Sequence, residues 1–326
     1  MYDYQASETR YANMPYRTCG RSGLKLSAIG LGLWQSFGAD KGHDDCFRRV
    51  AAAFDLGITH FDLADNYGPP PGAAENVFGM VLGREFKTYR DELVVTTKAG
   101  HAMWPGPYGD WGSRKHLMAG LEQSLQRLRL DYVDVFYHHR PDPETPLEET
   151  VGALADIVRQ GKALYVGLSK YPADLLKRAV ALLRERDVPC VAHQVRYNLI
   201  DREEVEREQL PAAQEAGVGT VAFSPLAQGV LTGKYADGVP DDSRAGQGSP
   251  FIARHLNEAN VAYARKVRDL ACARGQTPAQ TALAWVLRES RVASAVIGVN
   301  TVGQLRENVA ALDNLRFSEG ELAALG

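Results

Sequence analysis

The sequence predicts an α/β fold, a closed (β/α)8 TIM barrel that forms one domain over residues 1–326. Short segments rich in β-branched residues alternate with amphipathic helical patterns, which is typical of parallel α/β folds. Eight such strand segments are present, the number that closes a barrel, and ionisable residues follow several of them, where a barrel carries its active site. The expected strands are 28–31, 58–62, 93–97, 132–137, 163–167, 191–195, 220–223 and 295–298.

A β-hairpin is expected before the first barrel strand. Residues 16–19 and 24–27 flank a glycine-containing turn, so we expect the hairpin to cover the bottom of the barrel. Two connections, 99–112 and roughly 229–256, are rich in glycine and too long to be simple links. Because long loops in compact domains are usually functional, we expect both at the C-terminal face of the barrel.

Helical patterns follow most of the expected strands. In the clearest one, Ser113 can cap the N-terminus, and Leu117, Leu121, Leu125 and Leu128 repeat at the spacing of one buried helix face. The other expected helices are 44–56, 147–160, 174–186, 203–216, 257–274 and 301–312. A doubly wound dinucleotide-binding domain is the rival architecture, but the glycines at 30 and 32 lack the third glycine of its G-x-G-x-x-G motif.

Composition narrows the class of function. Hydrophobic residues make up 45% and charged residues 24% of the chain, as in an ordinary globular protein. A net charge of -3 argues against nucleic-acid and membrane surfaces and leaves small molecules as the expected partners. The polar N-terminus and the lack of a membrane-spanning segment predict a cytoplasmic protein. The four cysteines are far apart and form no C-x-x-C pair, so neither disulfides nor a metal site is expected.

Ionisable side chains follow three consecutive expected strands. Asp62 ends the second strand and Tyr67 follows it, Lys98 follows the third, and a histidine pair, His138 and His139, follows the fourth. Because the C-terminal ends of barrel strands meet at one mouth, we expect these groups to lie together. Each residue alone is more often explained by packing or by a salt bridge, but their joint occurrence favours an active site.

Tyr67 is the expected proton donor of this site. A phenol has an ordinary pKa of about 10, so it donates well only where nearby positive charge stabilises its anion. Lys98 can supply that charge, and Asp62 can keep the buried ammonium protonated. His139 can donate a hydrogen bond to a substrate carbonyl.

The segments around these residues resemble the aldo-keto reductase superfamily along nearly the whole chain. Residues 61–68, 97–98 and 139–141 are similar to the segments that carry the catalytic Asp, Tyr, Lys and His of that family. The resemblance implies a carbonyl reductase with the tetrad Asp62, Tyr67, Lys98 and His139. It favours His139 over His138, because the family's histidine lies two residues before a proline.

The same resemblance implies an NADP(H) site in the later part of the chain. Ser169 and Gln194 would hold the nicotinamide carboxamide, and Phe223 would stack on the nicotinamide ring. Arg244 would bind the 2′-phosphate, which favours NADP over NAD. The other residues that the resemblance assigns to the cofactor are Trp34, Asp62, Ser224, Leu226, Gly229, Lys234, Gly298, Asn300, Gln304, Glu307 and Asn308.

Within the superfamily, segments 66–72, 103–109 and 227–229 resemble bacterial L-glyceraldehyde 3-phosphate reductases and the β-subunits of voltage-gated potassium channels. The channel subunits carry Asn where this chain has His139, so the complete tetrad favours a working enzyme. The resemblance implies reduction of small aldehydes, first L-glyceraldehyde 3-phosphate and then methylglyoxal. The expected substrate residues are Trp34, Tyr67, Trp104 and His139, with Arg140, Lys170 or Arg196 near a substrate phosphate.

Two other classes of function stay open from the sequence. One is a nucleotide-sensing interaction protein, like the channel subunits, that binds NADP and turns over slowly. The other is a barrel aldolase or isomerase that uses Lys98 as a Schiff base. The sequence also leaves the oligomeric state open, and a homo-oligomer is one of the possibilities.

Overall fold

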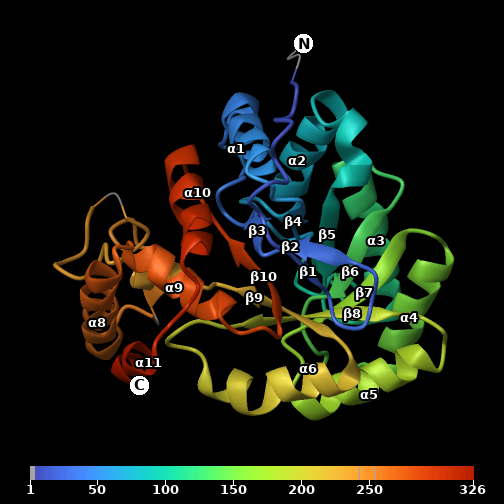
Figure 1. The fold of residues 1–326 in the computed structure, drawn as a ribbon. Helices are drawn as coiled ribbons and strands as arrows, with labels where there is room; N and C mark the ends of the chain where they lie inside the picture. Colours follow the sequence, from blue (N-terminus) through green and yellow to red (C-terminus); the bar gives the residue numbers. More distant parts are fainter. Residues whose placement is uncertain (1–3, 242, 254) are drawn as a thin grey trace.

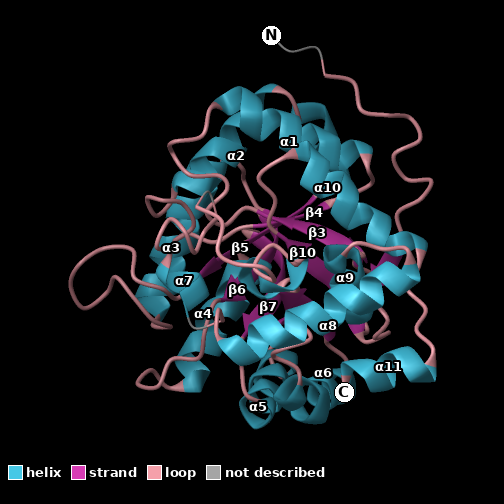
Figure 2. Cartoon of the chain, turned by 90° about the vertical axis from the view of Figure 1, so that its left-hand side faces the viewer, coloured by secondary structure: helices cyan, strands magenta, loops and turns pink. Residues whose placement is uncertain are grey.

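The computed structural model describes residues 4–241, 243–253 and 255–326, and in them eight parallel strands form a closed barrel (Figure 1). The order around the barrel is β10-β3-β4-β5-β6-β7-β8-β9, so the last strand pairs with the first and the expected (β/α)8 barrel is confirmed. Figure 2 shows the strands at the centre with helices around them. The barrel strands are β3 (Ile29–Gly32), β4 (His60–Asp62), β5 (Val94–Ala99), β6 (Val133–His138), β7 (Ala163–Ser169), β8 (Cys190–Arg196), β9 (Gly219–Phe223) and β10 (Val292–Ile297).

The expected helices lie outside the barrel. Ser113 accepts a hydrogen bond from the His116 backbone at the start of α3, and the four leucines expected on one face of α3 are buried. The helices that correspond to expected ones are α1 (His43–Asp55), α3 (Arg114–Leu128), α4 (Leu147–Arg159), α5 (Ala173–Arg184), α6 (Leu210–Ala216), α8 (Glu258–Arg274) and α10 (Val302–Val309).

The structure adds helices that the sequence pattern did not predict. They are α2 (Ala73–Arg84), α7 (Pro250–Ala253), α9 (Pro278–Leu287) and α11 (Glu319–Leu325), with short 3-10 helices η1 (Lys87–Glu92) and η3 (Ala227–Thr232). The expected helix 301–312 ends as a further 3-10 helix, η4 (Ala310–Asp313), after α10. In α9 every residue from 281 to 287 is buried, so this helix has no polar face and shows no amphipathic period. The expectation of one regular helix over 203–216 is wrong in detail. A π-helix, η2 (Val205–Gln209), comes before α6, because Pro211 has no N–H to donate to the ladder.

The hairpin lies across the N-terminal end of the barrel, as expected. Its strands, β1 (Tyr16–Thr18) and β2 (Lys25–Ser27), are antiparallel. The Arg17 guanidinium donates hydrogen bonds to the carbonyl oxygens of Val292, at 2.8 Å, and Leu287, at 2.7 Å. Val292 begins β10, so these bonds attach the hairpin to the bottom of the barrel.

The two long connections lie at the opposite, C-terminal end of the strands. One runs from β5 to α3, and the other runs from β9 to α8 and contains η3 and α7. Across the described part of the chain, no helix is both long and apolar enough to cross a membrane. In the same residues, no group of three or more His, Cys, Asp or Glu is arranged to hold a metal ion.

Gly79 lies where α2 packs against the end of α3. A Cβ added at Gly79 would lie 2.2 Å from the carbonyl oxygen of Arg127, which is closer than any real contact. We expect Gly79→Ala to lower the free energy of unfolding by about 1–3 kcal/mol, because the two helices must move apart. Urea denaturation measures this change.

Gly83, on the same helix, is the matched control. Its added Cβ would meet only the Arg129 side chain, at 3.7 Å, which is an ordinary contact. Gly83→Ala should therefore leave the stability unchanged or raise it by about 0.5–1 kcal/mol. If Gly79→Ala and Gly83→Ala are equally stable, the close approach of the Arg127 carbonyl oxygen is not the reason for a glycine at position 79.

Candidate active site

The side chains of Asp62, Tyr67, Lys98 and His139 meet at the C-terminal mouth of the barrel. Asp62 ends β4, Lys98 lies in β5 and His139 follows β6 directly. The Lys98 ammonium donates to Asp62 Oδ2 and to the Leu63 carbonyl oxygen, both at 2.6 Å. It lies 5.1 Å from the centre of the Tyr67 ring. The His139 ring meets the Tyr67 ring edge-on, with 5.9 Å between ring centres. The structure thus brings the four residues into one cluster.

Two further residues hold the Asp62 carboxylate. Thr96 Oγ1 donates to Asp62 Oδ1 at 2.8 Å, and Gln194 Nε2 donates to the same oxygen at 2.9 Å. With Lys98, these donors satisfy a carboxylate that is only 2% exposed. Sequence reasoning missed Thr96. Its signal was its position two residues before Lys98, which places both on one face of β5.

Burial sets the ionisation of the lysine and the phenol. The Lys98 side chain is fully buried, and this burial lowers the pKa of Lys98 while Asp62 opposes the shift. Burial, with Asp62 and Asp65 nearby, raises the pKa of Tyr67 well above its usual range. The positive charge of Lys98 therefore does not outweigh the increase that burial and the two carboxylates cause in the pKa of Tyr67. Tyr67 stays protonated at neutral pH and keeps a proton that it can donate.

The two histidines of the pair have different surroundings. Burial, followed by the charge of Lys170, lowers the pKa of His139 well below its usual range, so its ring is neutral at neutral pH. His139 Nδ1 is buried and has no hydrogen-bond partner within the described residues. His138 instead makes a 2.6 Å hydrogen bond through Nδ1 with the hydroxyl of Tyr171. His139, and not His138, is the histidine beside Tyr67.

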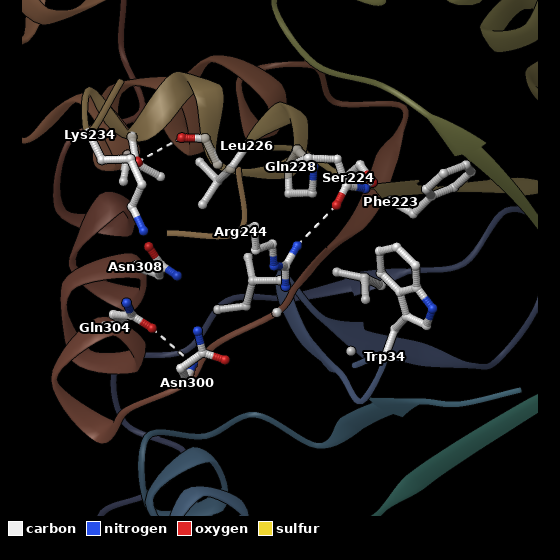
Figure 3. Close-up of a pocket in the computed structure, with 18 of the residues that line it drawn as sticks. Trp34, Phe223, Ser224, Leu226, Gln228, Lys234, Arg244, Asn300, Gln304 and Asn308 are labelled. Carbon is white, nitrogen blue, oxygen red and sulfur yellow. Dashed lines mark hydrogen bonds between the residues drawn. The ribbon is translucent and has the colours of Figure 1, made fainter. Parts of the chain in front are cut away.

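A cleft of about 610 Å³ extends from Asp62 and Tyr67 along the mouth to α10. Figure 3 shows Trp34 and Phe223 at one end, Lys234, Gln304 and Asn308 at the other, and Arg244 between them. Most of the residues expected at the cofactor line this cleft. They are Trp34, Asp62, Phe223, Ser224, Leu226, Gly229, Lys234, Arg244, Gly298, Asn300, Gln304, Glu307 and Asn308.

The lining of the cleft does not include Ser169, Gln194, Trp104 or His139, all of which were expected at the cofactor or the substrate. Ser169 and Gln194, at the ends of β7 and β8, are buried beside it, and Gln194 holds Asp62. Trp104, expected at the substrate, packs against His116 with 5.1 Å between ring centres. Of the expected substrate residues, the structure brings Trp34, Tyr67 and His139 together, and the Trp104 ring contacts His116 instead.

The cleft has the chemistry that a nicotinamide dinucleotide requires. Ser169 Oγ is buried without a hydrogen-bond partner in the described chain, so it is available to a polar group of a ligand. Lys234 and Arg244 line the cleft, and neither is part of an ion pair in the described residues. Unpaired cations of this kind suit phosphate groups, and the Phe223 ring offers a face for stacking. The residues present therefore fit this cofactor.

Sequence reasoning also missed part of the cleft wall. Gln228 accepts a hydrogen bond from Arg244 Nη1 at 3.0 Å and donates one to Ser224 Oγ at 3.1 Å (Figure 3). Gln228 and Gly229 have positive φ angles of 58° and 99°. This left-handed turn exposes the backbone of η3 to the cleft. The sequence signals for Gln228 were the neighbouring glycine and the family resemblance of segment 227–229, which gave Gln228 itself no role.

The fold and the cluster at its mouth define the class of the protein as a (β/α)8-barrel enzyme. The model of the Aldo/keto reductase family matches residues 28–326. The chain belongs to this family of oxidoreductases, as the sequence motifs predicted.

Relatives within the family extend the likeness over nearly the whole chain. The chain is 51% identical over 324 residues to an L-glyceraldehyde 3-phosphate reductase of Escherichia coli (strain K12), which covers 98% of this chain and 94% of the relative. The protein of that description from Escherichia coli O157:H7 gives the same values. A putative voltage-gated potassium channel subunit beta of Schizosaccharomyces pombe is 38% identical over 315 residues, which covers 92% of this chain and 89% of the relative.

Proposed function

We propose that the protein reduces small aldehydes to alcohols with NADPH. The leading substrate is L-glyceraldehyde 3-phosphate, and methylglyoxal is a second candidate. The observation that carries this proposal is the buried Lys98–Asp62 pair beside Tyr67 and His139, at the end of a cleft that suits a dinucleotide. The 51% identity to a protein named L-glyceraldehyde 3-phosphate reductase supports the choice of substrate.

When bound, the reduced nicotinamide supplies a hydride to the carbonyl carbon. Tyr67 gives its phenolic proton to the carbonyl oxygen, so the products are an alcohol and a phenolate that later takes a proton from water. Lys98 stabilises this phenolate, and Asp62 holds Lys98 in place. His139, as a neutral imidazole, donates a hydrogen bond to the carbonyl oxygen and orients it.

Other residues in the cleft and beside it hold the cofactor in this proposal. Ser169 and Gln194 would hold the carboxamide, and the Phe223 ring would stack on the nicotinamide. Lys234, exposed at the far end of the cleft, offsets phosphate charge. The middle of the cleft, where the cofactor would run, is lined by Ser224, Leu226, Gly229 and Gly298. Its adenosine end would be held by Asn300, Gln304, Glu307 and Asn308.

Oxidation of NADPH by the purified protein tests this proposal. We expect L-glyceraldehyde 3-phosphate to give the highest kcat/KM in a panel of small aldehydes, and NADPH to be preferred to NADH. Tight binding of NADPH with no oxidation across the panel would favour the nucleotide sensor instead.

Arg244→Met is expected to raise the Kd for NADPH by about 10- to 100-fold, because a charged hydrogen bond to the 2′-phosphate is lost. The Kd for NADH, which lacks this phosphate, should change little. Fluorescence titration with the two nucleotides measures both constants. An equal loss of affinity for NADPH and NADH would show that Arg244 supports the cleft wall through Gln228 and does not bind the 2′-phosphate.

A further inference from the structure

Two cations at the mouth of the barrel, Lys170 and Arg196, have no role in the proposed reduction or in cofactor binding. Lys170 follows β7 directly, and its N–H donates to the Gln194 carbonyl oxygen at 2.9 Å. Arg196 ends β8 and lies opposite Phe223 in the register of β8 and β9. Neighbouring strands thus carry both cations to the rim where the catalytic cluster lies.

The two cations converge on one aromatic ring. Lys170 Nζ lies 5.7 Å and Arg196 Cζ lies 5.8 Å from the centre of the Phe223 ring. Within the described residues, neither cation has a carboxylate partner. Like charges that gather without a counter-charge repel each other, and this repulsion is relieved when an anion binds between them.

A chain of close contacts joins Lys170 to the catalytic cluster. Its Nζ lies 3.4 Å from His101 Nε2, and the His101 ring meets the His139 ring edge-on with 4.4 Å between centres. Burial, followed by the charges of Lys98, Arg196 and Arg140, lowers the pKa of Lys170 to about 8. Lys170 therefore shares its electrostatic surroundings with both Lys98 and Arg196.

Arg140, the third cation considered from the sequence, is already engaged. Its Nη2 pairs with Asp110 at 2.6 Å, and its Nε donates to the Gly100 carbonyl oxygen at 2.8 Å. Its guanidinium also lies 3.7 Å from the centre of the Trp111 ring. These contacts hold the 99–112 loop together, so Arg140 is not available to a ligand.

The cations expected at the cofactor phosphates lie elsewhere. Figure 3 shows Lys234 at the end of the cleft away from Phe223. Lys170 and Arg196 flank Phe223 but are not part of the lining of the cleft. An anion held by this second pair would thus lie beyond the nicotinamide end, on the side of His101 and His139.

We propose that Lys170 and Arg196 form a binding site for the phosphate group of an aldehyde substrate, with His101 between this site and His139. A phosphate monoester carries nearly two negative charges at neutral pH, which matches two unpaired cations. The site fixes the phosphate at one side of the mouth while the carbonyl lies between Tyr67 and His139. This inference rests on the proposed function, because it places the anion on the aldehyde that the tetrad reduces.

The test compares glyceraldehyde 3-phosphate with unphosphorylated glyceraldehyde in Lys170→Met, Arg196→Met and the double variant. For the phosphorylated aldehyde, we expect each single variant to lower kcat/KM by about 10- to 100-fold, mainly through KM, because charged hydrogen bonds are lost. For glyceraldehyde, kcat/KM should stay within about 3-fold of the parent, since this substrate never used the site. The Kd for NADPH should not change.

Two control variants test whether the effect depends on the positive charge and on its position in the structure. Lys170→Arg keeps the charge and should keep most of the preference for the phosphorylated aldehyde. Lys266→Met removes an exposed lysine from α8, far along the chain from the site, and should change neither substrate.

The possible outcomes distinguish this inference from the proposed function. Equal losses on both aldehydes, or no loss on the phosphorylated one, would overturn the phosphate site and leave the reductase intact. If the parent protein oxidises NADPH with neither aldehyde, the proposed function fails, and the phosphate site is overturned with it.

Discussion

Tyr67→Phe is expected to lower kcat for aldehyde reduction by about 10²- to 10⁴-fold, because the group that protonates the carbonyl oxygen is lost. The Kd for NADPH should stay the same, since the phenyl ring keeps the contacts with Trp34 and His139. Stopped-flow and steady-state oxidation of NADPH measure the rate, and fluorescence titration measures the affinity.

Tyr137→Phe provides a matched control for this variant. Lys98 Nζ lies 5.5 Å from the Tyr137 ring, close to its 5.1 Å from the Tyr67 ring. The Tyr137 hydroxyl is buried and has no partner among the described residues, so its removal leaves no group unsatisfied. The control should keep full activity. If Tyr67→Phe also reduces aldehydes at the parent rate, Tyr67 is not the proton donor.

Lys98→Met is expected to impair both stability and catalysis. The Asp62 carboxylate would keep Thr96 and Gln194 as donors but lose its counter-charge in a buried position. Breaking a buried ion pair on one side costs about 3–5 kcal/mol, so the free energy of unfolding should fall by about that amount. The rate should also fall by about 10²-fold or more, because nothing stabilises the developing phenolate.

Adding Asp62→Asn to Lys98→Met separates the two effects. The neutral pair should recover most of the lost stability in urea denaturation, since no uncompensated charge stays buried. It should recover none of the catalytic rate. A double variant that regains activity would mean that Lys98 acts only by holding the structure of the mouth.

The structure confirms helices whose sequence signals lie within one short stretch of the chain. In α3, Ser113 and four leucines act within one helix, so spacing along the chain was enough to predict it. The start signals of α9 and α11 were also readable, because Thr277 with Gln280 and Ser318 with Glu321 form capping boxes. The pattern of α9 was still missed, since a helix that is buried on all sides has no alternation to detect.

In the active site, too, the sequence predicted some features, and others depended on contacts between distant parts of the chain. Asp62, Lys98 and His139 could be placed at one mouth, because each lies at or just after the C-terminal end of a strand and the strands of a barrel end together. The partners of Asp62 could not be derived, since Gln194 lies 132 residues away and only the closed register brings it near. The position of the Trp104 ring could not be derived either, because packing against His116 decides it. Loop side chains follow tertiary contacts that no local spacing encodes.

Transfer of deuterium from NADPH, labelled at its transferable position, to L-glyceraldehyde 3-phosphate is the most direct test of the proposed reduction. We expect the alcohol product to carry one deuterium at the former carbonyl carbon in the parent protein, and this transfer to be nearly abolished in Tyr67→Phe. Consumption of the aldehyde without label in the product, together with borohydride trapping of the substrate on Lys98, would contradict hydride transfer and establish a Schiff-base enzyme.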